Sequence, residues 1–280
     1  MDTTFSAFSG RVLFQKPSLE ELKKEYTLVD MHVHSNYSHD CITPVKSLLR
    51  RAGELGIGLS ITDHLREAGS IEAYKQKRIL VIPGIEIASL ENKEILLYFY
   101  SAKDLKDYYE RYIKNKLVVH KPTKSSIRGT LRAVRSRMKM TEIIDKADKY
   151  ANLKCIPHPY TYFNRSSNIF FARKKRAALL RRIEAVEVLN STHRRFMNNR
   201  AFKWAVKRGK AFTGGSDAHS LKEIGSAIVA SKADNVEGFL DSVKKKKNLV
   251  IGKELKFPTA LRAVLKSIGY KKKKARIHSI

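Results

Sequence analysis

Short apolar stretches rich in β-branched residues recur along the chain and predict strands. They span residues 27–33, 57–62, 79–87, 95–100, 153–157, 185–190, 211–215 and 226–230. Helical patterns lie between most of them, as at residues 45–55 before Gly56 and 198–208 before Gly209, where glycine is a common helix end. This alternation predicts an α/β domain with parallel strands. Several strands would then end together, where function concentrates in barrels.

The chain has no internal repeat and no long Gly/Ser/Pro linker, so we expect one domain in its 280 residues. We divide it into an N-terminal extension at 1–26, a barrel domain at 27–256 and a basic appendage at 257–280. Residues 19–26 form an amphipathic piece. Residues 122–140 are basic and weakly patterned, and fit an excursion or the start of a long helix.

Composition narrows the class of protein. Hydrophobic residues make up 42%, which is ordinary for a globular domain. No apolar run is long enough to span a bilayer, and residues 1–14 lack a signal-peptide pattern. Two cysteines, Cys41 and Cys155, do not make a disulfide framework. We therefore expect a cytoplasmic protein without a membrane partner; the sequence does not indicate an oligomeric state.

The charge is large and uneven. The formal net charge is +29. Residues 1–110 hold 14 Lys/Arg and 16 Asp/Glu, whereas residues 111–280 hold the other 42 and 11. Two interpretations remain open: a solvated basic surface, or a face that attracts a polyanion such as nucleic acid. The run Lys271-Lys-Lys-Lys-Ala-Arg276 fits either one.

Histidines and acids cluster where the predicted strands end. The clusters read HVHSNYSHD (32–40), TDH (62–64), PGIEI (83–87), PHP (157–159) and GGSDAH (214–219). His32 and His34 share a face of their strand, because side chains alternate, and both can reach one ion. Carboxylates would offset the charge of divalent ions, and Glu86 is the obvious bridge. Mixed nitrogen and oxygen donors suit Zn, Mn or Fe better than Ca or Mg.

These five motifs, in this order, resemble the PHP (polymerase and histidinol phosphatase) family from about Asp30 to Ala230. The resemblance implies a distorted (β/α)7 barrel with two or three divalent transition-metal ions. It also implies hydrolysis of phosphoesters by a metal-bound hydroxide. The substrate would be a phosphomonoester, a nucleotide or a nucleic-acid end. The alternative is a basic nucleic-acid-binding protein whose barrel is structural or regulatory.

The resemblance also implies the ligands. His32, His34, Glu86 and Asp217 would hold one ion, Glu86 and His158 would share in a second, and Asp40, His64 and His219 would hold the third. Glu86, Asp217 and His219 would carry catalysis. The amidohydrolases also begin with His-X-His, but no lysine here has the setting of their metal bridge.

Two ligand positions stay open. The family often has a histidine before the strand that follows the bridging glutamate, and Glu94 occupies that slot; His120 is its rival. At the first motif we choose Asp40 over His39, and we expect an exposed His39 to bind substrate phosphate. Arg194 and Arg195 suit a phosphate because guanidinium binds it bidentately, although an exposed charge cluster at a helix start is the slightly better interpretation.

The remaining candidates end or follow a predicted strand. Glu187 and Asn190 either line the pocket or satisfy backbone groups at the strand end. Phe202 and Trp204 are expected to pack in the core.

Overall fold

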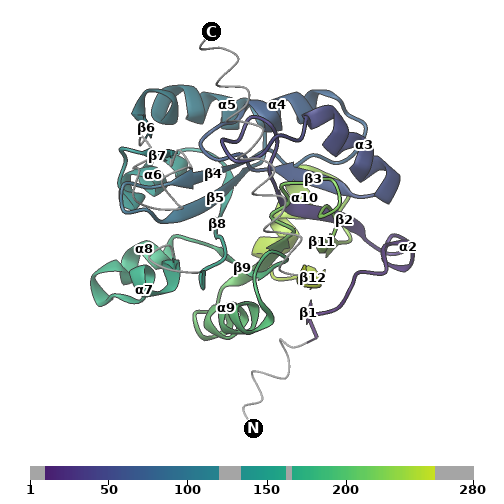
Figure 1. Ribbon diagram of the computed structural model, residues 1–280. Coiled ribbons are helices and arrows are strands. Elements are labelled where there is room, and N and C mark those ends of the chain that lie inside the picture. Colours follow the sequence, from purple (N-terminus) through teal and green to yellow (C-terminus); the bar gives the residue numbers. More distant parts are fainter. Residues whose placement is uncertain (1–9, 120–133, 162–165, 256–280) are drawn as a thin grey trace, which may run out of the picture.

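Two five-stranded sheets form the centre of the molecule (Figure 1). The computed structural model describes residues 10–119, 134–161 and 166–255. The strands of the first sheet, in order across it, are β1 (Val12–Leu13), β12 (Leu249–Gly252), β11 (Ala227–Ser231), β2 (Thr27–Val33) and β3 (Gly58–Ile61). Those of the second are β10 (Ala211–Gly215), β9 (Ala185–Asn190), β8 (Asn152–Ile156), β5 (Glu94–Phe99) and β4 (Gly84–Ala88). A separate pair joins β6 (Leu117–Val119) to β7 (Val134–Ser136).

The two large sheets do not close into one continuous ladder. Single backbone bridges join them: Val33 to Ala218, Leu59 to Val81 and His64 to Glu86. The first lies between β2 and the chain after β10, and the other two lie between β3 and β4. The edge strands of the second sheet therefore meet the first sheet at two seams: β4 at the edge strand β3, and β10 at β2, which lies inside the first sheet.

Strand β5 contradicts the expectation of parallel strands. The pairs β2–β3, β8–β9 and β9–β10 are parallel, and β11 is a second exception, antiparallel to both β12 and β2. Strand β5 runs antiparallel to both β4 and β8. The physical reason is the short connection from β4, closed by a hydrogen bond from Ser89 N to Lys93 O. A parallel partner would need a crossover of roughly a dozen residues or more.

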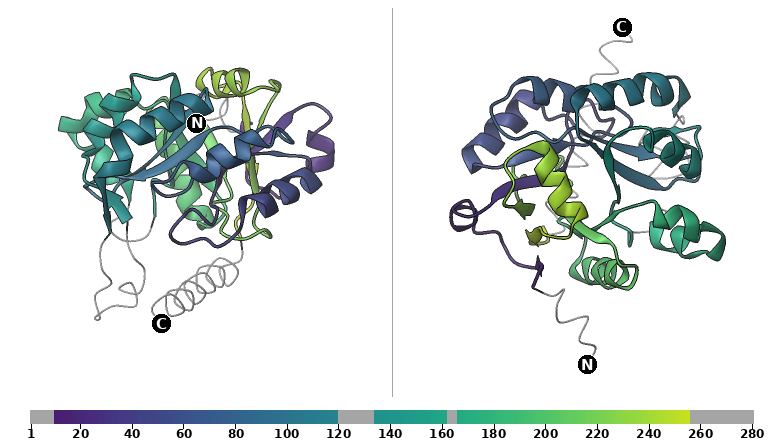
Figure 2. Two further views of the ribbon diagram at one scale, coloured as in Figure 1. Left: turned by 90° about the horizontal axis from the view of Figure 1, so that it is seen from above. Right: turned by 180° about the vertical axis from the view of Figure 1, so that it is seen from behind.

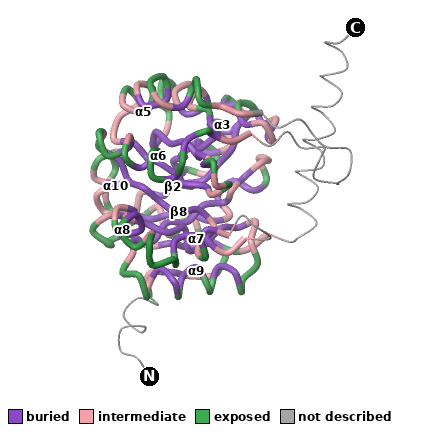
Figure 3. Tube along the Cα trace, turned by 90° about the vertical axis from the view of Figure 1, so that its left-hand side faces the viewer, coloured by how far each residue is buried: buried purple, intermediate pink, exposed green. Residues whose placement is uncertain are grey.

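Helices cover the sheets on the outside (Figure 2). They are α2 (Leu19–Leu22), α3 (Val45–Leu55), α4 (Ala68–Lys75), α5 (Ala102–Tyr108), α6 (Met140–Ala147), α7 (Ser167–Ala172), α8 (Ala177–Arg181), α9 (Arg195–Lys207) and α10 (Val236–Lys244). A π-helical turn, η1 (Tyr109–Ile113), follows α5 directly, and two short 3-10 helices are η2 (Lys114–Lys116) and η5 (Lys174–Arg176). The buried stretches follow the strands and the inner sides of the helices (Figure 3). Phe202 and Trp204 pack in this core, as predicted.

Most predicted elements appear near their expected places. Helix α3 has the predicted bounds and stops at Gly56, whose φ of 65° is left-handed; this conformation favours glycine. In the predicted 79–87 stretch, only Gly84–Ala88 forms a strand. Residues 12–13 of the predicted extension pair with β12. Residues 122–133, part of the basic excursion, and the 257–280 appendage lie outside the described residues. Within the described ranges, no helix has the length and apolar character needed to cross a bilayer.

Candidate metal centre

The ends of six strands bring histidines and acids together at one end of the fold. The donor atoms fall into four overlapping groups, with the atoms of each group within 4.8 Å of one another. The groups are His34–Asp40–His64–His219, His32–His158–Asp217, His32–His34–Glu86 and His64–Glu86–Glu94. Their members are the nine predicted ligands. The structure thus brings all nine together; their role as ligands remains a proposal.

Glu86 lies at the centre of this cluster. Its Oε2 is 3.0 Å from Nδ1 of His64 and 3.5 Å from Nε2 of both His32 and His34. Its Oε1 is 3.3 Å from Nε2 of His158. The side chain is fully buried, and neither oxygen accepts a hydrogen bond of acceptable geometry. Burial raises the pKa of this carboxyl, but the charges of His64 and His32 outweigh burial and hold the pKa well below its usual value. A bound cation would stabilise the same negative charge.

Asp40 organises the opposite side of the cluster. Its Oδ2 lies 3.2 Å from Nε2 of His64 and 3.3 Å from Nε2 of His219. His34 joins this group rather than serving only the His32 side. These distance groups differ from the three ligand sets that the family resemblance implies. His34 belongs to two groups, and His158 belongs to the group of His32 and Asp217.

Glu94 reaches the cluster from the other direction. Because β5 is antiparallel, its first residue lies beside the last residues of its neighbours. Oε2 of Glu94 is 3.9 Å from Nε2 of His158, and the residue is nearly buried. Its rival, His120, lies outside the described residues.

A buried carboxylate orients one of the histidines. Glu187 accepts from Nδ1 of His32 at 2.9 Å and from the backbone N–H of His158 at 2.8 Å. Asn190 Nδ2 also donates to Glu187 at 3.0 Å. Because Nδ1 of His32 donates to Glu187, its Nε2 faces the cluster and, once deprotonated, could offer its lone pair to an ion, as histidine ligands do when a carboxylate orients them. Both interpretations of Glu187 left open by the sequence therefore hold: it contacts a residue of the cluster and also accepts from a backbone N–H.

Asp217 is held in a similar way. Asn190 Nδ2 and Thr192 Oγ1 donate to its Oδ2 at 3.3 and 3.2 Å, while its Oδ1 lies 3.2 Å from Nε2 of His34. Its φ of 54° is left-handed, which aspartate tolerates better than most residues. One oxygen is therefore anchored and the other faces the cluster.

Three further acids accept hydrogen bonds from the loops that carry the clustered residues, and the sequence did not single them out. Asp30 accepts from Ser216 N and Oγ at 2.9 and 2.6 Å and from Gly225 N at 2.9 Å. Asp63 accepts from Ser35 N and Oγ, both at 2.6 Å. Glu223 accepts from His219 N at 2.8 Å. An acid directly beside a histidine motif is the one signal in the sequence, and Asp30 and Asp63 both have it.

The predicted substrate-binding residues have varied surroundings. His39 is half-buried rather than exposed, because its ring packs 5.0 Å from that of His64. Arg195 is tied to Glu254 at 2.6 and 2.9 Å and to the carbonyl of Phe14, so a phosphate would compete with this ion pair. Arg194 is exposed and precedes α9. His193, which was not singled out, stacks on His158 with ring centroids 5.2 Å apart.

Charges within the cluster set its protonation. Burial disfavours the imidazolium of His64, but the charges of Asp40 and Glu86 outweigh burial and raise its pKa to about 9. Burial acts on His158 too, and Glu86 and Glu94 again raise the pKa to about 9. For His34 burial prevails and lowers the pKa to about 4.

Metal binding should therefore release protons. His64 and His158 hold protons at pH 7 in the metal-free protein, and ligation requires their lone pairs. We expect affinity for Zn²⁺ or Mn²⁺ to rise as pH increases and to level off above about 9. Titration calorimetry at pH 7 in two buffers of different ionisation enthalpy measures the released protons. Equal heats in both buffers would contradict this expectation.

Comparisons with known proteins agree with this picture. Residues 196–248 match the profile of a family described as PHP-associated. An uncharacterized protein of Methanocaldococcus jannaschii is 25% identical over 210 residues, which cover 75% of this chain and 72% of that protein.

Two solved structures share the fold. A lesion-specific endonuclease from Pyrococcus furiosus superposes with a TM-score of 0.62 at 16% identity, over 80% of this chain and 57% of that one. A two-domain protein from Bacteroides vulgatus, which contains a predicted PHP-like metal-dependent phosphoesterase, gives a TM-score of 0.57 at 16% identity, over 91% of this chain and 73% of that one. The five ordered motifs, the profile matched by residues 196–248 and this shared fold are together similar to those of PHP family proteins.

Proposed function

We propose that the protein is a metal-dependent phosphoesterase acting on nucleotides or on nucleic-acid ends. The observation that carries the proposal is the partly buried cluster of nine donors around a fully buried carboxylate, Glu86. Imidazole and carboxylate donors together suit Zn, Mn or Fe. Two or three such ions would occupy the four overlapping donor groups. Bound divalent ions lower the pKa of a water molecule and neutralise charge that develops on phosphoryl oxygens.

The protein's own residues prepare the site for this chemistry. Glu187 and Asn190 keep His32 and Asp217 in fixed orientations, so that donor positions need not reorganise during reaction. Glu86 touches histidines from three different strands or strand ends and is placed to bridge ions. His32, His34 and Glu86 are fully buried, so charges interact more strongly there than in bulk water.

A second part of the proposal concerns how the strands of the two sheets surround the cluster. Strands β2, β3, β4, β5, β8, β9 and β10 surround the cluster, with the seams at β3–β4 and β10–β2 closed only by single bridges. We propose that these seven strands are a distorted barrel opened at two places.

Exposed cations on α9 and on the chain after α7, with an exposed aromatic on α9, favour a nucleic-acid substrate. The backbone N–H groups of Ser167 and Asn168, at the start of α7, bond to the carbonyl of Pro159, which follows His158. Exposed cations follow at Lys174 and Lys175. At the start of α9, Phe196 is 49% exposed with the guanidinium of Arg200 5.7 Å from its ring. Cations beside exposed aromatics suit a phosphate backbone with unstacked bases. The fold shared with a lesion-specific endonuclease points the same way.

The direct test combines metal analysis with a substrate panel. We expect purified protein to carry divalent transition metal, and chelation to abolish hydrolysis of a generic phosphomonoester that added Mn²⁺ or Zn²⁺ restores. The panel should include nucleotides and oligonucleotides with 5′- and 3′-phosphates. Correctly folded protein that binds no metal would favour the alternative, a nucleic-acid-binding protein whose barrel is structural.

A further inference from the structure

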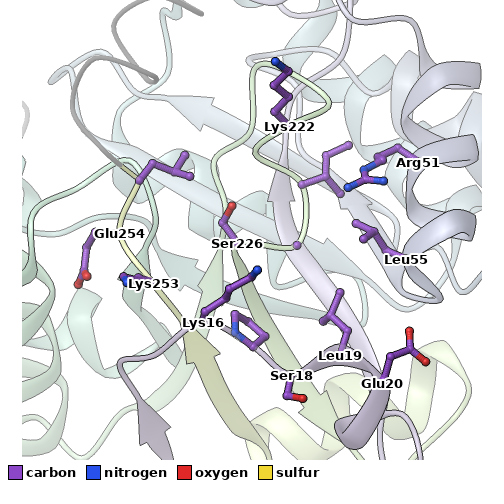
Figure 4. A pocket seen from close by; sticks show the side chains of 14 residues that line it. Lys16, Ser18, Leu19, Glu20, Arg51, Leu55, Lys222, Ser226, Lys253 and Glu254 are labelled. Carbon is purple, nitrogen blue, oxygen red and sulfur yellow. The ribbon is translucent and has the colours of Figure 1, made fainter.

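A cavity outside the metal centre lies between the N-terminal segment, α3 and the loop before β11 (Figure 4). Its volume is about 550 Å³, within the range of roughly 300–1,000 Å³ that is usual for small-molecule sites. Leu19 and Leu55 line one side, and Lys253 and Glu254 lie on the other (Figure 4). None of the nine clustered donors lines it.

The cavity combines an apolar lining with unpaired positive charge. Pro17, Leu19, Leu55, Ile224 and Leu255 supply apolar surface. Three exposed lysines line the cavity: Lys16, Lys222 and Lys253. In the part of the chain that the structure describes, none of their ammonium groups has a hydrogen bond or an ion pair.

The acids at the cavity do not neutralise these lysines. Glu20 pairs with Lys23 at 2.7 Å, and Glu254 pairs with Arg195 at 2.6 Å. Both carboxylates are thus engaged by cations that do not line the cavity. The three lysines therefore carry positive charge that these two acids do not balance. Lysine ammonium groups bind phosphate as compact point charges.

We propose that this cavity is a second ligand site, for a phosphorylated molecule with an apolar body of mononucleotide size. The phosphate would lie at the lysine-bearing rim of the cavity, and the base would cover the leucine side. Inorganic phosphate would leave the apolar lining exposed to water, and an uncharged nucleoside would leave the lysines unpaired. Recognition therefore needs both parts of the ligand.

The site shares a loop with the metal centre. Lys222, Ile224 and Gly225 line the cavity, and the same loop carries Asp217 and His219. Gly225 N donates to Asp30, and Glu223 holds the backbone of His219. A ligand in the cavity would thus contact the loop that presents two of the proposed ligands.

Binding of AMP, adenosine and inorganic phosphate by calorimetry tests the proposal. The measurement uses Glu86→Gln protein as well as wild type, because Glu86→Gln removes the bridge of the metal centre and leaves the cavity intact. We expect AMP to bind Glu86→Gln protein, and adenosine and phosphate to bind it more weakly; wild type, whose metal centre is itself proposed to take nucleotides, should bind AMP at least as well. Replacing Lys16, Lys222 and Lys253 together by alanine should weaken AMP binding by about tenfold or more.

A matched triple variant controls for net charge. Lys103, Lys207 and Lys232 are exposed lysines that do not line the cavity, and their joint replacement by alanine should leave AMP affinity within about twofold. The proposal is overturned if AMP does not bind at millimolar concentration, if both triple variants behave alike, or if Glu86→Gln abolishes binding. Equal affinity for phosphate and AMP would overturn the role of the apolar lining. These outcomes do not depend on hydrolysis, so they leave the proposed function to its own test.

Discussion

Replacing Glu86 by glutamine should abolish metal-dependent hydrolysis with little change in shape. The substitution keeps the volume but removes the charge, and it puts an amide NH₂ where an oxygen donor stood. Two of the four donor groups contain Glu86, so one change weakens both. Metal chemistry is worth several kcal/mol of transition-state stabilisation, and we expect hydrolysis to fall by at least about a hundredfold. Elemental analysis should show lower metal occupancy alongside the activity assay.

The control is Glu237→Gln, which makes the same chemical change on the exposed first turn of α10. It should leave metal content and hydrolysis unchanged. Full metal occupancy and near-normal activity in Glu86→Gln, with wild-type circular dichroism, would show that Glu86 does not bridge ions.

Gly215→Ala should damage both stability and the metal site. An added Cβ would lie 2.6 Å from the backbone nitrogen of His32 and closer still to its Cβ. Backbone cannot yield as a flexible side chain can, so β10 and β2 must separate. Overpacking of this kind typically costs about 1–3 kcal/mol, measured here as the free energy of unfolding in denaturant. Metal affinity should fall as well, because Asp217 N donates to the carbonyl of His32 across this contact.

Gly53→Ala serves as the comparison. Gly53 lies inside α3, and an added Cβ there meets nothing within 4 Å. Alanine should stabilise the helix by roughly 0.5–1 kcal/mol and leave metal affinity alone. If Gly215→Ala proved as harmless as Gly53→Ala, the close packing of β10 on His32 would have no bearing on the site.

The cluster could be predicted from the sequence because each donor motif follows a strongly apolar strand. A run of apolar residues identifies a buried strand, and the ends of neighbouring parallel strands meet at the same edge of a sheet. The length of the connection before β5 also predicts the direction of this strand. Only residues 88–94 separate the two predicted strands, too few for a parallel crossover. Side-chain alternation, by contrast, is the same in either direction.

The supporting contacts could not be predicted in the same way. Glu187 bonds to His32 across 155 positions of sequence, and Asp30 bonds to Ser216 across 186. Such pairs depend on how two sheets meet, and a single sequence carries no periodic signal for that. Whether the seams close also depends on a few backbone bridges rather than on any pattern.

The two seams have a consequence for the newly made chain. His32 and His34 emerge early in synthesis, whereas Asp217 and His219 belong to the last third of the sequence and reach the centre only across the β10–β2 seam. Until that late segment docks, the early histidines form only part of a chelating site. Pairing over so long a separation is intrinsically slow. Ion capture would therefore be one of the final events of maturation, and it would lock the two halves of the molecule together.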